Sequence, residues 1–314
     1  MRLNPIVKKD IKVQARSMKM AWGIFAYEAI LAGVFFIALL FISNQSIYDN
    51  SNIYSKIVWL YPVLAIAQIM IIAIVIPVQT SSAISGEKER QTFDIMMTTS
   101  MTPFSIIMGK VGIAMVQGLF FIVASLPVMA LTFVIGGMSW SYLFWFFAMA
   151  LLVSFFAASI GIICSSLCKK TISGVIFSYG IYACFFVLTA VPYFVWEVVS
   201  GYQTTASPWS LLMLANPFIY LTEFVKLTMT GSSFIEDSGW LYASGTKKGF
   251  MHWLGTENHW MIVSTIVYIL ISLLFLWIAA KRITPISHRK AKELSHRKAK
   301  ELVDGRNNVP ETKN

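Results

Sequence analysis

The sequence predicts an all-α, polytopic integral membrane protein with six transmembrane helices. Of its 314 residues 57% are hydrophobic and 13% are charged, with a mean hydropathy of +0.67, whereas a soluble domain carries about 25% charged residues. The apolar residues come in blocks long enough to cross a hydrocarbon core, which takes roughly 20 helical residues. The sequence lacks the alternation of apolar and polar residues that is typical of the strands of a β-barrel.

The first segment, residues 1–20, has apolar side chains at steps of three and four positions. Leu3, Val7, Ile11, Ala15 and Met18, with Trp22 just beyond the segment, therefore fall on one helical face, and the other face is largely basic. We expect an amphipathic elbow helix along the inner leaflet, with its lysines at anionic lipid headgroups. A solvated helix is the alternative. The segment is too long and too mixed for the basic start of a cleavable signal peptide.

Six apolar blocks follow, and together they predict a transmembrane domain over residues 21–280. Aromatic residues such as Trp22, Trp140 and Trp260 stand near the ends of the blocks, as they do at membrane interfaces. The predicted spans are residues 22–42, 57–79, 106–135, 140–167, 172–196 and 260–280.

Small residues recur every four positions in two of these spans. Ala157, Gly161 and Ser165 do so in the fourth, and Gly174 and Ser178 repeat the spacing in the fifth. Such a spacing permits close helix packing, either within one chain or between two chains.

Lysine and arginine predict the orientation of the spans. Six precede the first span, three lie between the second and third, two lie between the fourth and fifth, and ten follow the sixth. The loops on the other side hold Lys56, Lys226, Lys247 and Lys248. Because basic residues accumulate on the cytoplasmic side, we expect both termini in the cytoplasm and the chain in the inner (plasma) membrane. The net charge of +10 is then a topology signal, and nucleic acid is not needed as a partner.

An external loop is expected over residues 200–259. Its first half, residues 208–230, is apolar but interrupted at Pro208 and Pro217, which indicates a re-entrant segment or one at the outer interface. Its second half is polar and glycine-rich. After the last span, residues 281–314 form a basic cytoplasmic tail that contains the octapeptide SHRKAKEL twice in tandem. Either a helix at the anionic membrane face or a flexible tail fits this composition.

The most informative segment is the internal loop of residues 86–103, between the second and third spans. Gly86 can end the preceding helix, and Thr102 followed by Pro103 signals the start of the next one. A charge cluster and an apolar face stand between these signals. We therefore predict a short amphipathic helix that offers both to a cytoplasmic partner; an ordinary solvated loop is the alternative.

At this loop the sequence resembles the permeases of the type-2 ATP-binding-cassette exporters. That family has a cluster of the form E-x-E-R-G-T, a hydrophobic pair, small hydroxylated residues, a proline and a Gly-Lys pair that opens the third span. Gln91 departs from the pattern where glycine is usual, and Ser100 departs where proline is frequent. The matching residues are Glu87, Glu89, Arg90, Thr92, Phe93, Asp94, Met96, Met97, Thr98, Thr99, Pro103, Gly109 and Lys110.

The resemblance extends over nearly the whole chain, and it implies a permease subunit that forms the translocation pathway of an exporter. It implies a coupling helix over residues 87–101, seated in a groove of a separate nucleotide-binding ATPase subunit. It also implies pairing of two permeases, identical or homologous, with ATP and Mg on the partner ATPase and no cofactor on this chain. The residues assigned to ATPase coupling are Glu87, Lys88, Glu89, Arg90, Thr92, Phe93, Asp94, Met96, Met97 and Thr98.

Other motifs exclude several kinds of site. No G-x-x-x-x-G-K-[ST] phosphate loop occurs, because Gly109-Lys110 lacks the upstream glycine and the following hydroxyl residue. The ATPase therefore has to be another polypeptide. Neither a metal site nor a set of catalytic residues is expected, since no histidine is placed centrally in a span. The three cysteines lie in apolar stretches and indicate neither a disulfide nor a zinc site.

An ATP-independent secondary transporter or channel is the alternative function. Such proteins mark their pathway with intramembrane polar groups or helix breaks, and Glu28, Gln68 and Gln117 are the possible pathway residues. Glu28 is the only acid well inside a span, and its position also permits a local hydrogen bond. An apolar pathway is compatible with a peptide, a lipid or a hydrophobic drug as substrate.

Overall fold

A computed structural model of the chain describes residues 18–48, 57–93, 102–136, 140–199, 209–235, 250–256 and 258–283. All regular elements in these ranges are helices, and six are long and apolar enough to cross a membrane. The predicted all-α, six-span fold class is therefore confirmed. The elbow helix predicted over residues 1–20 lies almost wholly outside the described residues, as does the tail beyond residue 283.

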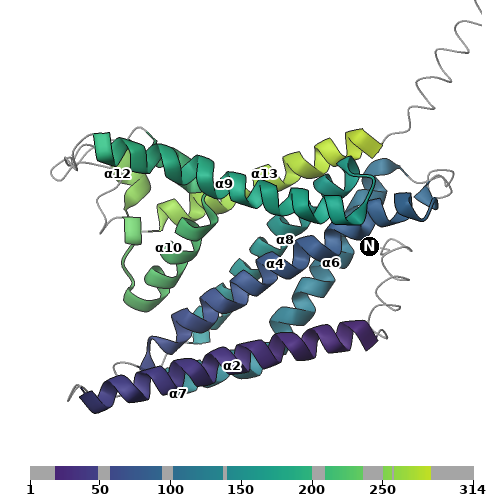
Figure 1. Cartoon of the computed structure of the whole chain (residues 1–314). Helices are drawn as coiled ribbons and strands as arrows, with labels where there is room; N and C mark the ends of the chain where they lie inside the picture. The colour runs from purple at the N-terminus through teal and green to yellow at the C-terminus, as the bar shows by residue number, and fades with distance from the viewer. Residues whose placement is uncertain are drawn as a thin grey trace, which may run out of the picture.

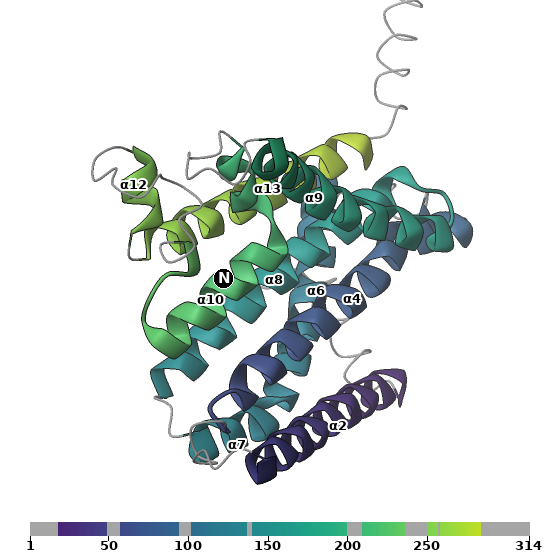
Figure 2. The same cartoon turned by 60° about the vertical axis from the view of Figure 1, so that its left-hand side comes forward.

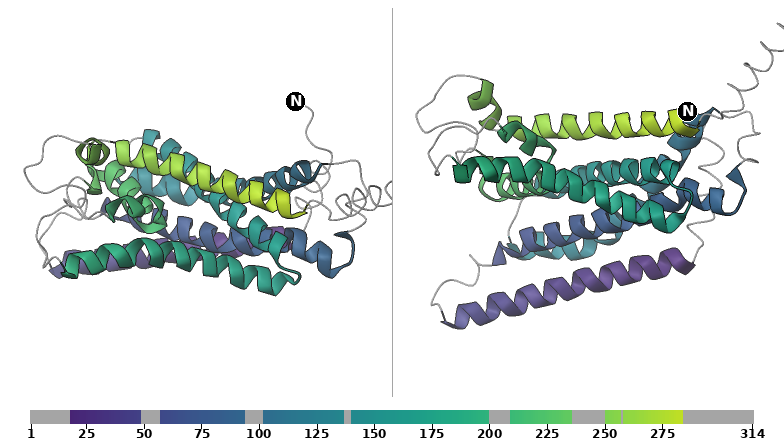
Figure 3. Two further views of the ribbon diagram at one scale, coloured as in Figure 1. Left: turned by 90° about the horizontal axis from the view of Figure 1, so that it is seen from above. Right: turned by 45° about the horizontal axis from the view of Figure 1, so that its top comes forward.

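The long helices run roughly along one direction (Figure 3). They are α2 (Met18–Tyr48), α4 (Leu60–Glu89), α6 (Pro103–Ala124), α8 (Trp140–Leu167), α9 (Thr171–Val199) and α13 (His259–Ile283) (Figure 1). The shorter elements are α7 (Leu126–Gly136), the 3-10 helix η1 (Ser210–Ala215), α10 (Pro217–Thr230) and α12 (Phe250–Gly255).

Helix α8 is the centre of the bundle, where it packs against α4, α6, α9 and α13. In its most apolar stretch 67% of the residues are buried, against 17% in α2 and 22% in each of α9 and α13. Helix α2 lies at the edge beside α4 (Figure 2). Large parts of α2 and α9 are therefore left for contact with lipid or with another protein.

The small residues allow α4 to approach α8 and α9 closely within this one chain. A Cβ atom added at Gly161 would overlap the hydroxyl oxygen of Thr80 and lie 3.2 Å from the Pro77 carbonyl oxygen. A Cβ atom at Gly174 would lie 3.2 Å from the carbonyl oxygen of Ser81. The hydroxyl of Ser165 accepts hydrogen bonds from the backbone nitrogens of α4 residues 84 and 85, at 2.8 and 2.9 Å. The repeated spacing thus serves packing between helices of the same subunit.

Two of the spans differ from their predicted extents. Helix α4 continues to Glu89, ten residues beyond the predicted end at residue 79, and Gly86 lies inside it. The predicted third span, residues 106–135, is broken at Ser125 into α6 and α7. Pro127 explains the break because it has no backbone N–H with which to continue the α6 ladder. At 30 residues and about 1.5 Å per residue, α4 exceeds a hydrocarbon core of about 30 Å, so its last turns project beyond that core.

The apolar half of the predicted external loop folds back onto the bundle. Helix α10 begins at Pro217, where Asn216 caps it by accepting hydrogen bonds from the backbone nitrogens of residues 218 and 219. The Asn216 amide donates to the Thr189 hydroxyl of α9 at 2.8 Å. The ring of Tyr220 packs 5.1 Å from that of Tyr268 in α13. This short helix is thereby fixed against two spans.

Candidate coupling site

Three pieces of chain meet at one end of the bundle (Figures 1 and 2). They are the last turn of α4, the first turns of α6, and the short connection between α8 and α9. The ends of α4 and α6 are also the two ends of the predicted coupling segment. Hydrogen bonds from three consecutive residues of α4 hold this junction together.

Glu87 joins α4 to α6. Its Oε1 atom lies 2.6 Å from the Nζ atom of Lys110, and the two side chains are 25% and 15% exposed. An ion pair sheltered to this degree is screened less by water than one on an open surface. The second oxygen, Oε2, is buried without a hydrogen-bond partner among the described residues. Glu87 thus ties the helix that enters the coupling segment to the helix that leaves it.

Lys88 joins α4 to the end of α8. Its Nζ atom donates to the carbonyl oxygens of Ser166, at 2.5 Å, and Cys168, at 3.3 Å. These carbonyls belong to the last turn of α8 and to the residue that follows it, where no intrahelical donor remains and a positive charge is favoured. The same ammonium group lies 5.8 Å from the centroid of the Phe93 ring. Lys88 is therefore a C-terminal cap supplied by a different helix.

Glu89 joins α4 to the start of α9. Its two carboxylate oxygens accept from the backbone nitrogen of Thr171, at 2.9 Å, and from the Thr171 hydroxyl, at 2.8 Å. Thr171 is the first residue of α9, so the carboxylate occupies the place of an N-cap. The three charges of the motif thus face three different helices.

The backbone that follows turns sharply at Gln91. This residue has φ = 58° and is the one non-glycine residue with positive φ among the described residues. The nitrogen of Gln91 donates to the carbonyl of Lys88 at 3.2 Å, and that of Thr92 donates to the carbonyl of Glu87 at 3.0 Å. This pair of bonds is a Schellman motif, which favours glycine at the left-handed position. The departure at residue 91 therefore falls where the local turn needs glycine most, and the turn forms nonetheless.

The predicted start signal of the helix after the loop, Thr102 followed by Pro103, is confirmed. Thr102 caps α6 by accepting a hydrogen bond from the nitrogen of Ser105 at 3.3 Å, and Pro103 occupies the first turn. The prediction that the preceding helix ends at Gly86 is wrong, because α4 continues to Glu89 and the chain turns only at Gln91. The segment between these caps is thus shorter than the sequence predicts.

The residues assigned to ATPase coupling divide into three groups. Glu87, Lys88 and Glu89 are engaged inside the chain, and Phe93 packs partly buried against the core. Arg90 and Thr92 are exposed, and the Thr92 hydroxyl donates to the carbonyl of Glu87 at 3.3 Å. The remaining four, Asp94, Met96, Met97 and Thr98, lie outside the described residues.

Sequence reasoning missed the partners of these charges. Thr171 and the carbonyls of Ser166 and Cys168 lie 78 to 82 positions from the motif, and a backbone carbonyl leaves no signal in a sequence. One available signal was the short basic connection Lys169-Lys170-Thr171. A connection of that length has to bring a helix end and a helix start to the same side as the motif.

The possible pathway residues lie on three different helices. Glu28 is on α2, where its Oε1 atom is buried without a partner among the described residues. Gln68 is on α4, fully buried, with neither amide atom hydrogen-bonded in the described part of the chain. Gln117 is on α6. None of the three lines the cavity between α4, α8, α9, α10 and α13 described below.

Within the described ranges no group of three or more His, Cys, Asp or Glu side chains is placed to hold a metal ion. The junction offers ion pairing and helix capping, which join four helix ends to one another.

Comparisons with known proteins place the chain in a family. No curated protein matches the sequence. The model of a family described as ABC-2 family transporter protein matches residues 5–281, which include the predicted coupling segment and all but the last two residues of the sixth span. Membrane subunits of this family are not themselves ATPases, and the family implies association with a cytoplasmic ATPase subunit. Because the match covers most of the chain, this multi-pass membrane protein belongs to the ABC-2 transporter family and is a membrane subunit of an ABC transport system.

Proposed function

We propose that the chain is the permease subunit of an ATP-driven exporter, which forms the translocation pathway and couples to a separate cytoplasmic ATPase. Family membership supports the transport role. The observation that supports coupling at this place is the attachment of Glu87, Lys88 and Glu89 to α6, α8 and α9. ATP and Mg bind to the partner subunit, and this chain needs no cofactor.

The junction gives a route from the ATPase to the membrane. A force on the segment of residues 92–102 acts directly on α4 and α6, which it connects. Lys88 and Glu89 extend the same force to the end of α8 and the start of α9. Rigid helices held in this way tilt as a unit, which is the expected way for a local event to reach a distant site.

Arg90 is the residue of the cluster that we assign to contact with the ATPase. It is exposed, whereas the three residues before it bond within the chain. A guanidinium group recognises carboxylates in a fixed, bidentate geometry, so an acidic groove would suit it. Met96 and Met97 are proposed to supply the apolar part of the same contact.

Two permeases and two ATPases form the proposed exporter. The exposed apolar residues of α2 and α9, such as Phe36 at 62% and Phe194 at 61% exposed, suit lipid or a second permease, identical or homologous. Both termini lie in the cytoplasm, and the N-terminal residues rest on anionic lipid. The family match favours this assignment over an ATP-independent secondary transporter or channel.

Affinity purification of the tagged chain from its native membrane, followed by mass spectrometry and an ATPase assay, tests the proposal. We expect a cassette ATPase to co-purify. The variant Arg90→Glu should lose that partner. A matched control is Arg282→Glu, which reverses another exposed basic residue at the end of α13 and should retain it. Recovery of the wild-type chain without an ATPase, under conditions that preserve other membrane complexes, would contradict the proposal.

A further inference from the structure

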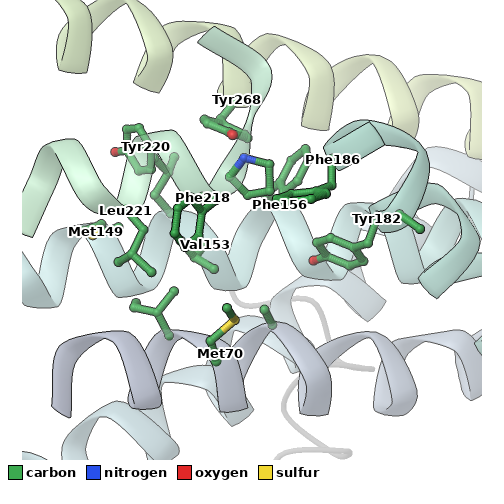
Figure 4. A pocket seen from close by; sticks show the side chains of 15 residues that line it. Met70, Met149, Val153, Phe156, Tyr182, Phe186, Phe218, Tyr220, Leu221 and Tyr268 are labelled. Carbon is green, nitrogen blue, oxygen red and sulfur yellow. The ribbon is translucent and has the colours of Figure 1, made fainter. Parts of the chain in front are cut away.

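A cavity of about 330 Å³ lies inside the bundle, between α4, α8, α9, α10 and α13 (Figure 4). All fifteen residues that line it are uncharged, and most are aliphatic or aromatic. Pockets of this size and composition are typical of small-molecule sites. Charged ligands find no counter-charge here.

The cavity lies near the middle of the membrane. Met70 is ten residues from the start of α4, and Tyr182 is eleven residues from the start of α9, which runs the opposite way. At about 1.5 Å per residue, both lie some 15 Å from a helix end, about half the thickness of the hydrocarbon core. A ligand at this depth is surrounded by the apolar part of the bilayer.

Two phenol groups line the cavity, that of Tyr182 from α9 and that of Tyr268 from α13 (Figure 4). Both hydroxyl oxygens are buried, and neither has a hydrogen-bond partner among the described residues. The neighbouring Tyr220 differs, since its hydroxyl lies 2.9 Å from that of Thr265. A buried hydroxyl without a partner is rare, because it has lost its bonds to water without replacement. The hydroxyls of Tyr27, Tyr61, Ser210 and Ser264 are also buried without a partner among the described residues, but none of these four residues lines this cavity. A ligand with an acceptor oxygen would therefore satisfy two donors of the same cavity at once.

Phe156 holds both phenol rings in place. Its ring centroid lies 4.8 Å from that of Tyr268 and 6.1 Å from that of Tyr182, both in edge-to-face contacts. The Tyr268 ring also packs against Tyr220. The two hydroxyls are thus fixed before a ligand arrives, which lowers the entropic cost of binding.

The cavity opens to the side of the bundle. Three of its lining residues are about half exposed, Met70 at 47%, Phe186 at 48% and Phe218 at 47%. They belong to α4, α9 and α10, so a molecule dissolved in the bilayer reaches the cavity between these helices without crossing water.

We propose that this cavity binds an uncharged lipophilic molecule with a carbonyl or ether oxygen, which accepts hydrogen bonds from Tyr182 and Tyr268. A peptide fits poorly, because its charged termini and amide N–H groups would meet apolar walls and few acceptors. The inference rests on the proposed function, because it takes the bound molecule to be of the class that the exporter transports. The binding itself needs no ATPase.

Photolabelling of the full chain in phosphatidylcholine vesicles tests the proposal. The probe is the methyl ester of a fatty acid that carries a diazirine, and the comparison probe is the acceptor-free alkyl diazirine of the same length. We expect saturable labelling of peptides that contain Met70 or Met149, blocked by excess unlabelled ester. Tyr182→Phe with Tyr268→Phe should raise the half-saturating ester concentration about tenfold, as loss of buried hydrogen bonds does, and leave the alkyl probe unchanged.

The matched control is Tyr179→Phe, which removes a hydroxyl from the same helix that donates to the Ile74 carbonyl at 2.7 Å, outside the cavity lining. It should leave ester labelling unchanged, and labelling by the alkyl probe reports whether each variant is folded. Labelling of the cavity that does not saturate, or equal ester binding by the double Phe variant, would overturn the proposal. These outcomes are independent of the purification experiment, because the vesicles contain no ATPase.

Discussion

The carboxylate of Glu89, in the last turn of α4, caps α9 through Thr171, with oxygens 2.9 Å from its nitrogen and 2.8 Å from its hydroxyl. Residues 89 and 171 come from helices between which α6, α7 and α8 lie in the sequence. A cap of this kind transmits displacement, because it fixes the end of one helix to the start of another. In the exporter that we propose, the cap would link the fifth span to the predicted coupling segment.

The Glu89→Ala variant should therefore uncouple ATP hydrolysis from transport. Loss of the cap leaves the first N–H groups of α9 without an acceptor, and α9 no longer follows α4. We expect the purified complex to retain basal ATPase activity but to lose most of its stimulation by substrate. Glu89→Gln keeps a carbonyl acceptor and should behave nearly as the wild type. Full stimulation in Glu89→Ala would show that the cap does not transmit force.

The pair of Glu87 and Lys110 should contribute to stability as a unit. Either Glu87→Gln or Lys110→Met alone leaves a sheltered charge without its partner, and we expect each to lower the free energy of unfolding by about 2 kcal/mol. The double variant should cost less than the sum of the two by about 1 kcal/mol. Thermal unfolding of the four proteins in one detergent measures this coupling. Strictly additive effects would mean that the two charges act separately.

The turn at Gln91 predicts a stabilising substitution. A left-handed residue other than glycine is strained, so Gln91→Gly should raise the free energy of unfolding by about 0.5 to 1 kcal/mol, net of the entropy of glycine in the unfolded chain. Gln91→Val should have the opposite effect, because β-branched side chains tolerate this conformation least. Unfolding temperatures of the three proteins give the order. An order in which the Val variant is the most stable of the three would contradict the left-handed turn.

The number and order of the spans could be predicted from the sequence, because apolar runs of about 20 residues have few alternatives. The end of α4 at Glu89 could not be predicted. Residues 80–89 are polar and resemble a loop, yet Thr80 and Ser85 turn their hydroxyls to carbonyls one turn back, at 2.8 and 2.5 Å. Ser165 of α8 accepts two backbone N–H groups of the same turn. A polar stretch is thus buried by bonds that only the folded chain reveals.

The position of the candidate site along the chain could be predicted from the sequence, but the contacts of its residues could not. The charges of Glu87, Lys88 and Glu89 indicate an interaction surface when they are considered along the chain. Their partners come from three other parts of the sequence, so only the packing of α4 against α6, α8 and α9 shows that they bond within the chain. The cavity tyrosines Tyr182 and Tyr268 gave no signal, since aromatic residues are common in every span.

The close approach of α4 to α8 makes Gly161 sensitive to a single methyl group. In Gly161→Ala the new Cβ would overlap Thr80, so the helices have to separate at the level of the Ser165 hydrogen bonds. We expect a loss of about 2 kcal/mol of stability, as for other overpacked sites. Gly180→Ala is the matched control, since a Cβ there meets nothing within 4 Å and alanine favours the helix. Equal unfolding temperatures for the two variants would refute this packing.

The buried acid of α10 predicts a dependence of stability on pH. Glu223 is fully buried, and its Oε2 atom accepts a hydrogen bond from the nitrogen of Ile235 at 3.1 Å. Its helix is not one of the six candidate spans. Burial raises the pKa of this carboxyl group, and bonds with Ser233 and with the backbone of residues 234 and 235 only partly oppose the rise.

The folded chain therefore holds the Glu223 proton to a higher pH than the unfolded chain, whose pKa is about 4.3. Between the two pKa values the folded state binds more protons, so stability falls as pH rises and levels off above the raised pKa. Glu223→Gln carries no such proton. We expect the variant to match the wild type near about pH 4 and to exceed it in unfolding temperature as the pH approaches about 8. All other titrations are shared by the two proteins and cancel in the difference. A difference that stays constant over this range would mean that Glu223 titrates normally in the fold, and one that grows toward low pH would reverse the sign of the shift.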